Sequence, residues 1–110
     1  MKDGWVYLLG DWNRDGIYKI GVTSGDIDNR IKKLQTGNSA EIYLCDKFKT
    51  NHPFYLESQL HIKFGNQKIL NEWFQLTDDE ALHFKDFCNE IEERIIALKD
   101  NPFFPKNLNE

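Results

Sequence analysis

Residues 5–21, WVYLLGDWNRDGIYKIG, decide the fold of the N-terminal half of the chain. Residues 5–9 and 17–21 are rich in β-branched and aromatic side chains, and the segment between them is dominated by Gly, Asp and Asn. This pattern predicts a β-hairpin. If the loop closes symmetrically, Leu9 faces Ile17, and Tyr7 lies directly opposite Lys19 on the same face.

The segment after the hairpin has the periodicity of an amphipathic helix. Over residues 26–36, Ile27, Ile31 and Leu34 share one helical face, and an aspartate stands near the positive N-terminal end. Arg30 lies three residues after Ile27, at the edge of that apolar face.

A second helix is expected from Pro53 to about Phe64, since proline suits the first helical turn. Leu56, Leu60 and Phe64 form an apolar stripe, and Glu57 points in nearly the same direction as Phe64. The pattern therefore places a carboxylate within an apolar face, where charged groups are rare without a partner.

The remaining segments complete an α+β fold. We expect a small antiparallel sheet of three strands, or four with a short last strand, flanked by helices, and a long acidic C-terminal helix opened by a capping box at residues 77–80. The further expected elements are a strand over residues 41–49, a short strand over 73–76 and the C-terminal helix over about 78–99.

Length and composition favour one domain over residues 1–110, with a core at about 4–77, the C-terminal helix, and an irregular tail at 100–110. The two cysteines form no CxxC pair and have no histidine cluster nearby, so neither a disulfide framework nor a zinc site is expected. A reducing compartment fits best.

The net charge of −4 argues against a generic nucleic-acid-binding protein, but the acidity is unevenly distributed. Residues 1–70 carry ten Lys/Arg and eight Asp/Glu, whereas residues 71–110 carry four Lys/Arg and ten Asp/Glu. The acidity therefore belongs to the C-terminal part of the chain.

No apolar run reaches the roughly 18 residues of a membrane span, so we expect a soluble, cytoplasmic protein without a targeting segment.

The order Trp5-Val6-Tyr7, Lys19-Ile20-Gly21, Arg30 and then Glu57 on a later helix resembles the GIY-YIG nuclease superfamily. It is most similar to the small, phage-associated branch whose second motif reads K-I-G. The resemblance covers roughly residues 4–77. Residues 16–18 also spell Gly-Ile-Tyr, but no second Y-I-G follows at the required distance, so the first-motif tyrosine is Tyr7.

The resemblance implies an endonuclease that hydrolyses phosphodiester bonds of DNA with one divalent cation, Mg²⁺ or Mn²⁺, held by Glu57. It assigns catalytic roles to Tyr7, Lys19, Arg30 and Glu57, and it implies that the protein acts in the cytoplasm of a bacterial or phage-infected cell. The ligand preferences of the groups fit these roles, because Mg²⁺ often binds through one or two carboxylates and the arginine side chain matches phosphate oxygens. A facing Lys19 would lower the pKa of Tyr7 toward that of a useful base.

Other residues are weaker candidates. His61, one turn after Glu57, could orient the carboxylate or contact phosphate, or could simply pack at a helix edge. Trp12, in the hairpin loop, could stack on a base. Candidate substrate-binding residues are Gly21, Lys32, Lys33 and Asn71, although an ordinary loop position explains Asn71 better.

Two function classes stay open beside the endonuclease. One is a catalytically silent module that binds nucleic acid or protein, with the acidic C-terminal helix as a site for a protein partner or self-association. The other is an antagonist that presents acidic surface to a DNA-binding protein. A fold alone does not distinguish these three functions. The joint presence of the four catalytic candidates favours the endonuclease.

Overall fold

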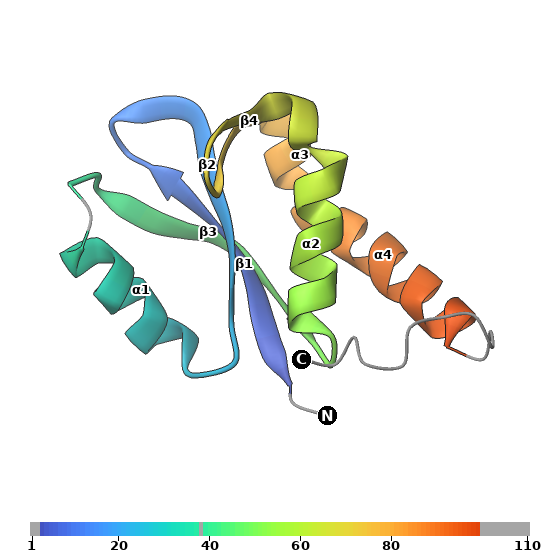
Figure 1. The fold of residues 1–110 in the computed structure, drawn as a ribbon. Coiled ribbons are helices and arrows are strands. Elements are labelled where there is room, and N and C mark those ends of the chain that lie inside the picture. Colours follow the sequence, from blue (N-terminus) through green and yellow to red (C-terminus); the bar gives the residue numbers. More distant parts are fainter. Residues whose placement is uncertain (1–2, 38, 100–110) are drawn as a thin grey trace.

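The computed structural model describes residues 3–37 and 39–99. The expected tail at 100–110 lies outside these residues. The elements along the chain are β1 (Gly4–Asp11), β2 (Arg14–Thr23), α1 (Ile27–Thr36), β3 (Ile42–Thr50), α2 (Pro53–Lys63), a 3-10 turn (Gly65–Gln67), β4 (Lys68–Leu70), β5 (Trp73–Gln75), α3 (Asp78–Leu82) and α4 (Phe84–Leu98) (Figure 1).

The fold is α+β with an antiparallel sheet, as expected, but the sheet has five strands rather than three or four. The strand order is β3-β1-β2-β5-β4, and all pairs are antiparallel. The additional strand is β4, which forms a hairpin with β5 around a two-residue turn at Asn71 and Glu72. Three-residue strands are too short to show an alternating pattern, so their pairing partner identifies them and their own sequence does not.

The β1–β2 hairpin forms, but the predicted register is wrong by two residues. Tyr7 pairs with Gly21, and Lys19 pairs with Leu9. The turn closes asymmetrically, because the Asp11 carboxylate accepts hydrogen bonds from the Asn13 amide at 2.9 Å and from Arg14 Nε at 2.7 Å. A shift of two residues conserves the face, so Tyr7 and Lys19 still share one side of the sheet, as diagonal neighbours.

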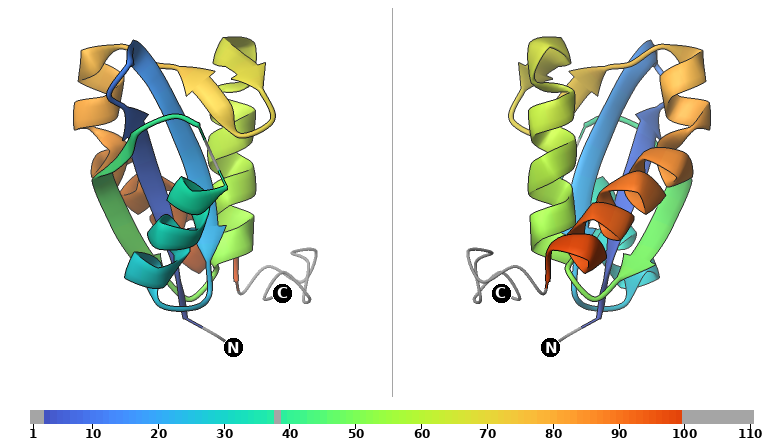
Figure 2. Two further views of the ribbon diagram at one scale, coloured as in Figure 1. Left: turned by 90° about the vertical axis from the view of Figure 1, so that its left-hand side faces the viewer. Right: turned by 90° about the vertical axis from the view of Figure 1, so that its right-hand side faces the viewer.

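The helices lie on both faces of the sheet and beside it (Figure 2). Helix α1 covers one face, where Tyr7, Leu9 and Ile27 form a small core. Helix α4 covers the opposite face, where the larger core lies, and α2 runs alongside β2. The larger core is built from Val6, Leu8, Ile20, Leu56, Leu60, Phe64, Phe74, Leu76, Phe84, Cys88, Ile91 and Ile95.

The C-terminal segment was expected to be one helix and is two. The predicted capping box is present: the Thr77 hydroxyl accepts from the Glu80 amide, and the Glu80 carboxylate accepts from the Thr77 amide. The helical path is interrupted at His83, whose ring nitrogen Nδ1 lies 2.8 Å from the Asp79 carbonyl. The His83 amide donates to the same carbonyl at 3.1 Å, and the Phe87 amide donates to the His83 carbonyl at 3.1 Å, so backbone hydrogen bonds continue through the break between the two helices.

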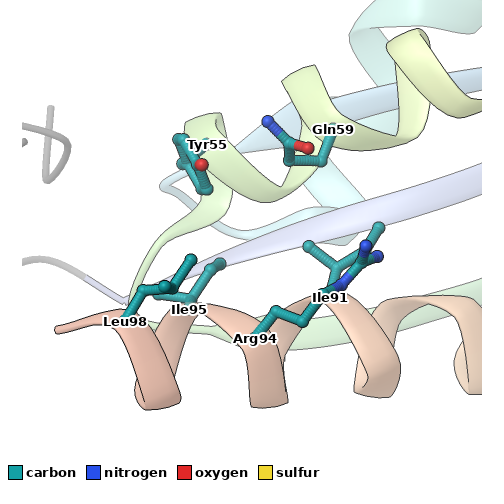
Figure 3. Close-up of a pocket in the computed structure, with 6 residues that line it drawn as sticks. All are labelled: Tyr55, Gln59, Ile91, Arg94, Ile95 and Leu98. Carbon is teal, nitrogen blue, oxygen red and sulfur yellow. The ribbon is translucent and has the colours of Figure 1, made fainter. Parts of the chain in front are cut away.

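Helix α4 packs its apolar side on the domain, as its periodicity predicts. Phe84, Cys88, Ile91 and Ile95 are buried in the larger core. A pocket of about 140 Å³ remains between α2 and α4, lined by Tyr55, Gln59, Ile91, Arg94, Ile95 and Leu98 (Figure 3).

Within the described residues, no helix is long and apolar enough to cross a membrane.

Candidate active site

Tyr7 lies fully buried on β1, with its ring across the neighbouring strand at Gly21. A Cβ placed on residue 21 would lie 2.5 Å from the Tyr7 hydroxyl oxygen and 2.6 Å from two ring carbons. Only glycine leaves room for this ring. The K-I-G glycine therefore has a packing reason that does not depend on substrate contact.

Arg30 reaches the same tyrosine from α1. Its Nε lies 3.4 Å from Tyr7 Oη, so the guanidinium donates a long hydrogen bond to the phenol oxygen. Burial raises the pKa of Tyr7 above its ordinary value, although Arg30 opposes this. The expectation that Lys19 would lower the Tyr7 pKa is wrong, because the adjacent cation is Arg30 and desolvation of the ring outweighs it.

Lys19 has a carboxylate partner. Its Nζ lies 3.0 Å from Glu72 Oε1, with 13% of the lysine side chain and 39% of the glutamate side chain exposed. Glu72 lies beside Lys19 because β5 pairs with β2 at Trp73 and Lys19. The backbone carbonyl of Glu72 also accepts a hydrogen bond from the Ile20 amide at 3.0 Å. Glu72 is the site residue that the sequence did not reveal.

The sequence indicates that Lys19 needs an acidic partner, an edge position or a path to solvent, because this lysine stands in an apolar strand. It does not indicate which acidic residue is the partner. Asn71, the candidate next to it, is exposed and has φ = 53°, a left-handed conformation that asparagine tolerates. Its place in the turn explains this residue, and Glu72 is the one that reaches the site.

Glu57 approaches from α2, and only 16% of its side chain is exposed. Burial, together with the neighbouring negative charge of Glu72, raises the pKa of Glu57 from 4.5 to about 7, while Lys19 acts in the opposite direction. The charges of Glu57 and Glu72 also raise the pKa of Tyr7. The Arg30–Tyr7 hydrogen bond, together with the electrostatic influence of Lys19 on Glu57 and of Glu57 on Tyr7, places these four side chains in one neighbourhood.

His61 fixes α2 against the sheet. Its Nε2 lies 3.0 Å from the Ile20 carbonyl oxygen, so the Nε2–H tautomer donates to the part of β2 that extends past β5. The same nitrogen is 3.8 Å from Glu57 Oε2, too far for a hydrogen bond. The ring also packs edge-on against Phe74, with centroids 4.9 Å apart. This geometry places His61 as a support beside Glu57.

The family model described as T5orf172 domain matches residues 4–92. The chain belongs to the T5orf172 domain family. This domain is found in phage-associated and homing-endonuclease-like proteins. The match spans every strand of the sheet and continues through α3 into α4, beyond the stretch at 4–77 that carries the motif resemblance.

One curated relative is the uncharacterized protein 460R of Invertebrate iridescent virus 6. It is 32% identical over 79 residues, which are 68% of this chain and 36% of the viral protein. The T5orf172 domain described here therefore spans about a third of that relative. No solved structure matches the chain.

The remaining candidates of the T5orf172 domain lie outside the cluster of charged side chains. Lys32 and Lys33 are exposed on α1, on the helix that carries Arg30.

Among the described residues, no group of three His, Cys, Asp or Glu side chains could hold a metal ion. Glu57 and Glu72 supply the carboxylate oxygens in the cluster around Tyr7.

Proposed function

We propose that this T5orf172 domain is a metal-dependent endonuclease that hydrolyses phosphodiester bonds of DNA by a GIY-YIG-type mechanism. The observation that carries the proposal is the convergence of Tyr7, Lys19, Arg30 and Glu57 from β1, β2, α1 and α2. Side chains from four separate elements meet at one place, and a structural ion pair would not require this arrangement. Clusters of perturbed titratable groups are characteristic of functional sites.

The donor set fits one Mg²⁺ or Mn²⁺. Glu57 is largely buried, and its ionised form is disfavoured by burial and by Glu72, so a cation beside it would relieve both effects. Mg²⁺ keeps several waters and needs only one or two carboxylates, and Glu57 would hold it. When bound, the cation supplies charge neutralisation at a phosphate and an activated water.

The protein's own side chains would divide the remaining work. Arg30 presents N–H donors suited to phosphate oxygens, and its Nε already holds the Tyr7 phenol oxygen. Since the pKa of Tyr7 is raised, the neutral hydroxyl would position a water or phosphate oxygen through its own hydrogen, and free tyrosinate would not act as the base. His61 would keep α2, and with it Glu57, at a fixed distance from β2.

The face that bears Tyr7 also offers contacts for a nucleic-acid backbone. Lys47 pairs with Tyr7 and Lys49 pairs with Trp5 across β1 and β3. Their ammonium groups lie 4.8 and 5.9 Å from the centroid of the Trp5 ring. Lys32 and Lys33 on α1 add further exposed positive charge. Such lysines would bind phosphates without sequence preference.

Trp12 is a candidate for base stacking. Its side chain, in the β1–β2 turn, is 66% exposed and stacks on Tyr43 with centroids 4.1 Å apart. A rigid, exposed aromatic pair can accept a base on its free face. The viral relative and the phage association of the family support a role in bacterial or virus-infected cells.

A catalytically silent DNA-binding module is the second candidate, and one observation favours it. Tyr7 is completely buried, so its hydroxyl could meet a water or phosphate only after its surroundings moved. Substrate binding can bring catalytic hydrogen bonds into line that are poorly aligned in a free enzyme. The same cluster would otherwise serve only to bind phosphate.

The test is cleavage by Glu57→Gln, which keeps the shape of the side chain and removes the charge that a hard cation requires. Single- and double-stranded DNA is incubated with Mg²⁺ or Mn²⁺, and Glu93→Gln, at an exposed position of α4, is the matched control. We expect wild type and the control to cleave and Glu57→Gln to be inactive. Cleavage by Glu57→Gln at the wild-type rate would refute the proposal, and inactivity of the wild type with retained DNA binding would favour the silent module.

A further inference from the structure

The partners of the Lys19–Glu72 ion pair differ in their freedom to move. Lys19 lies in β2 between β1 and β5, and its ammonium is 5.6 Å from the centroid of the Trp73 ring. Glu72 lies in the two-residue turn between β4 and β5, and 39% of its side chain is exposed, three times the fraction of Lys19. The carboxylate can rotate into water, whereas the ammonium is held in the site.

When both carboxylates are ionised, the charges of the cluster are balanced before any substrate binds. Lys19 and Arg30 carry two positive charges, and Glu57 and Glu72 carry two negative charges when ionised. Arg30 already uses its Nε for Tyr7. A phosphate that enters this cluster adds negative charge beside two carboxylates, and its natural binding group is the ammonium of Lys19. That group becomes available when Glu72 leaves it.

We propose that Glu72 is a resident counter-ion of Lys19 and that a phosphate of a DNA backbone displaces it. Lys19 is then a substrate-binding residue, and the β4–β5 turn holds the group that occupies its place in the free protein. The exchange is favoured because the Glu72 side of the pair is open to water and the phosphate restores a negative partner for Lys19. The inference rests on the proposed DNA substrate and does not depend on cleavage.

A double-mutant cycle in DNA binding tests this exchange. The full chain is titrated with a short fluorescent DNA duplex and with the matching single strand, in EDTA so that no cleavage occurs. The variants are Glu72→Gln, Lys19→Met and the double variant. Asp46→Asn is the matched control, because Asp46 pairs with Lys85 at 3.4 Å on the α4 side of the sheet, and its loss changes the net charge by the same amount.

We expect Glu72→Gln to bind DNA more tightly, by up to about fivefold at low salt, because the ammonium no longer has to be released. Lys19→Met should bind more weakly and lower the slope of log affinity against log salt by about one. The double variant should match Lys19→Met. Asp46→Asn should change affinity less than Glu72→Gln does. Thermal melts confirm that each variant folds, and Glu72→Ala serves if Glu72→Gln does not.

Three outcomes would overturn the inference: a gain for Glu72→Gln no larger than for Asp46→Asn, a gain that persists without Lys19, or no measurable DNA binding by Glu72→Gln. Its failure is distinguishable from failure of the proposed catalysis. Wild-type protein that binds DNA and follows the cycle, but does not cleave with Mg²⁺, would refute the endonuclease and leave the exchange standing. Cleavage without the cycle would do the opposite.

Discussion

Replacing Glu57 by glutamine should stabilise the metal-free protein at alkaline pH. The pKa of Glu57 is raised by burial and by Glu72 from 4.5 to about 7, so the folded protein binds a proton more tightly than the unfolded chain does. Between these two values the folded state holds more protons, and stability falls as pH rises. Below about pH 4.5 the favourable contribution of the protonated carboxyl is fully present, and above about pH 7 it is lost.

The size of the effect follows from the same interval. At about 1.4 kcal/mol per pKa unit, Glu57 costs about 3 kcal/mol of unfolding free energy above pH 7 relative to acid conditions. The side chain is 16% exposed, so solvent screening removes only a small part of this cost. Glutamine resembles the protonated carboxyl in shape and polarity, and should therefore be close to neutral at pH 4 and stabilising by roughly 2–3 kcal/mol at pH 8.5.

Urea unfolding monitored by tryptophan fluorescence, in EDTA at both pH values, measures the two free energies. Glu93→Gln controls for the change in net charge at an exposed site. If Glu57 were instead a member of a buried structural ion pair, removal of its charge would destabilise the protein by about 3–5 kcal/mol. A less stable Glu57→Gln at pH 8.5 would therefore refute the reasoning. Loss of cleavage with gain of stability would identify a residue kept for function.

Two further predictions concern Tyr7 and its neighbours. Gly21→Ala should lower the unfolding free energy by about 1–3 kcal/mol, because the new methyl group overlaps the buried Tyr7 ring, whereas Gly65→Ala, with no atom within 4 Å of the added Cβ, should melt like wild type. A wild-type melting temperature for Gly21→Ala would contradict this packing role and favour direct contact of Gly21 with substrate. Tyr7→Phe should retain DNA binding and slow cleavage by about 10²-fold or more, while Arg30→Ala should weaken both binding and rate. Equal loss of binding in the two variants, measured by titration in EDTA, would show that the tyrosine hydroxyl contributes to affinity.

Local sequence patterns predict most of the helices and strands, and the motif resemblance names the four residues that cluster in the structure. Periodicity placed α1, α2 and β3 within one or two residues of their bounds, because apolar spacing and caps such as Asp26 and Thr77 are local properties. It also put Tyr7 and Lys19 on one sheet face, since that depends only on alternation along the strands.

The strand register and the partners of the site residues depend on contacts between distant segments, so they became apparent only in the folded structure. Hydrogen bonds of Asp11 set the hairpin register, and this made Gly21 the residue under the Tyr7 ring. Pairing of β5 with β2 brought Glu72 to Lys19, 53 positions earlier in the chain, and Arg30 took the place beside Tyr7 that the sequence had given to Lys19. The pKa values of Tyr7 and Glu57 followed from burial, which no local pattern reports, because desolvation is a property of the assembled core.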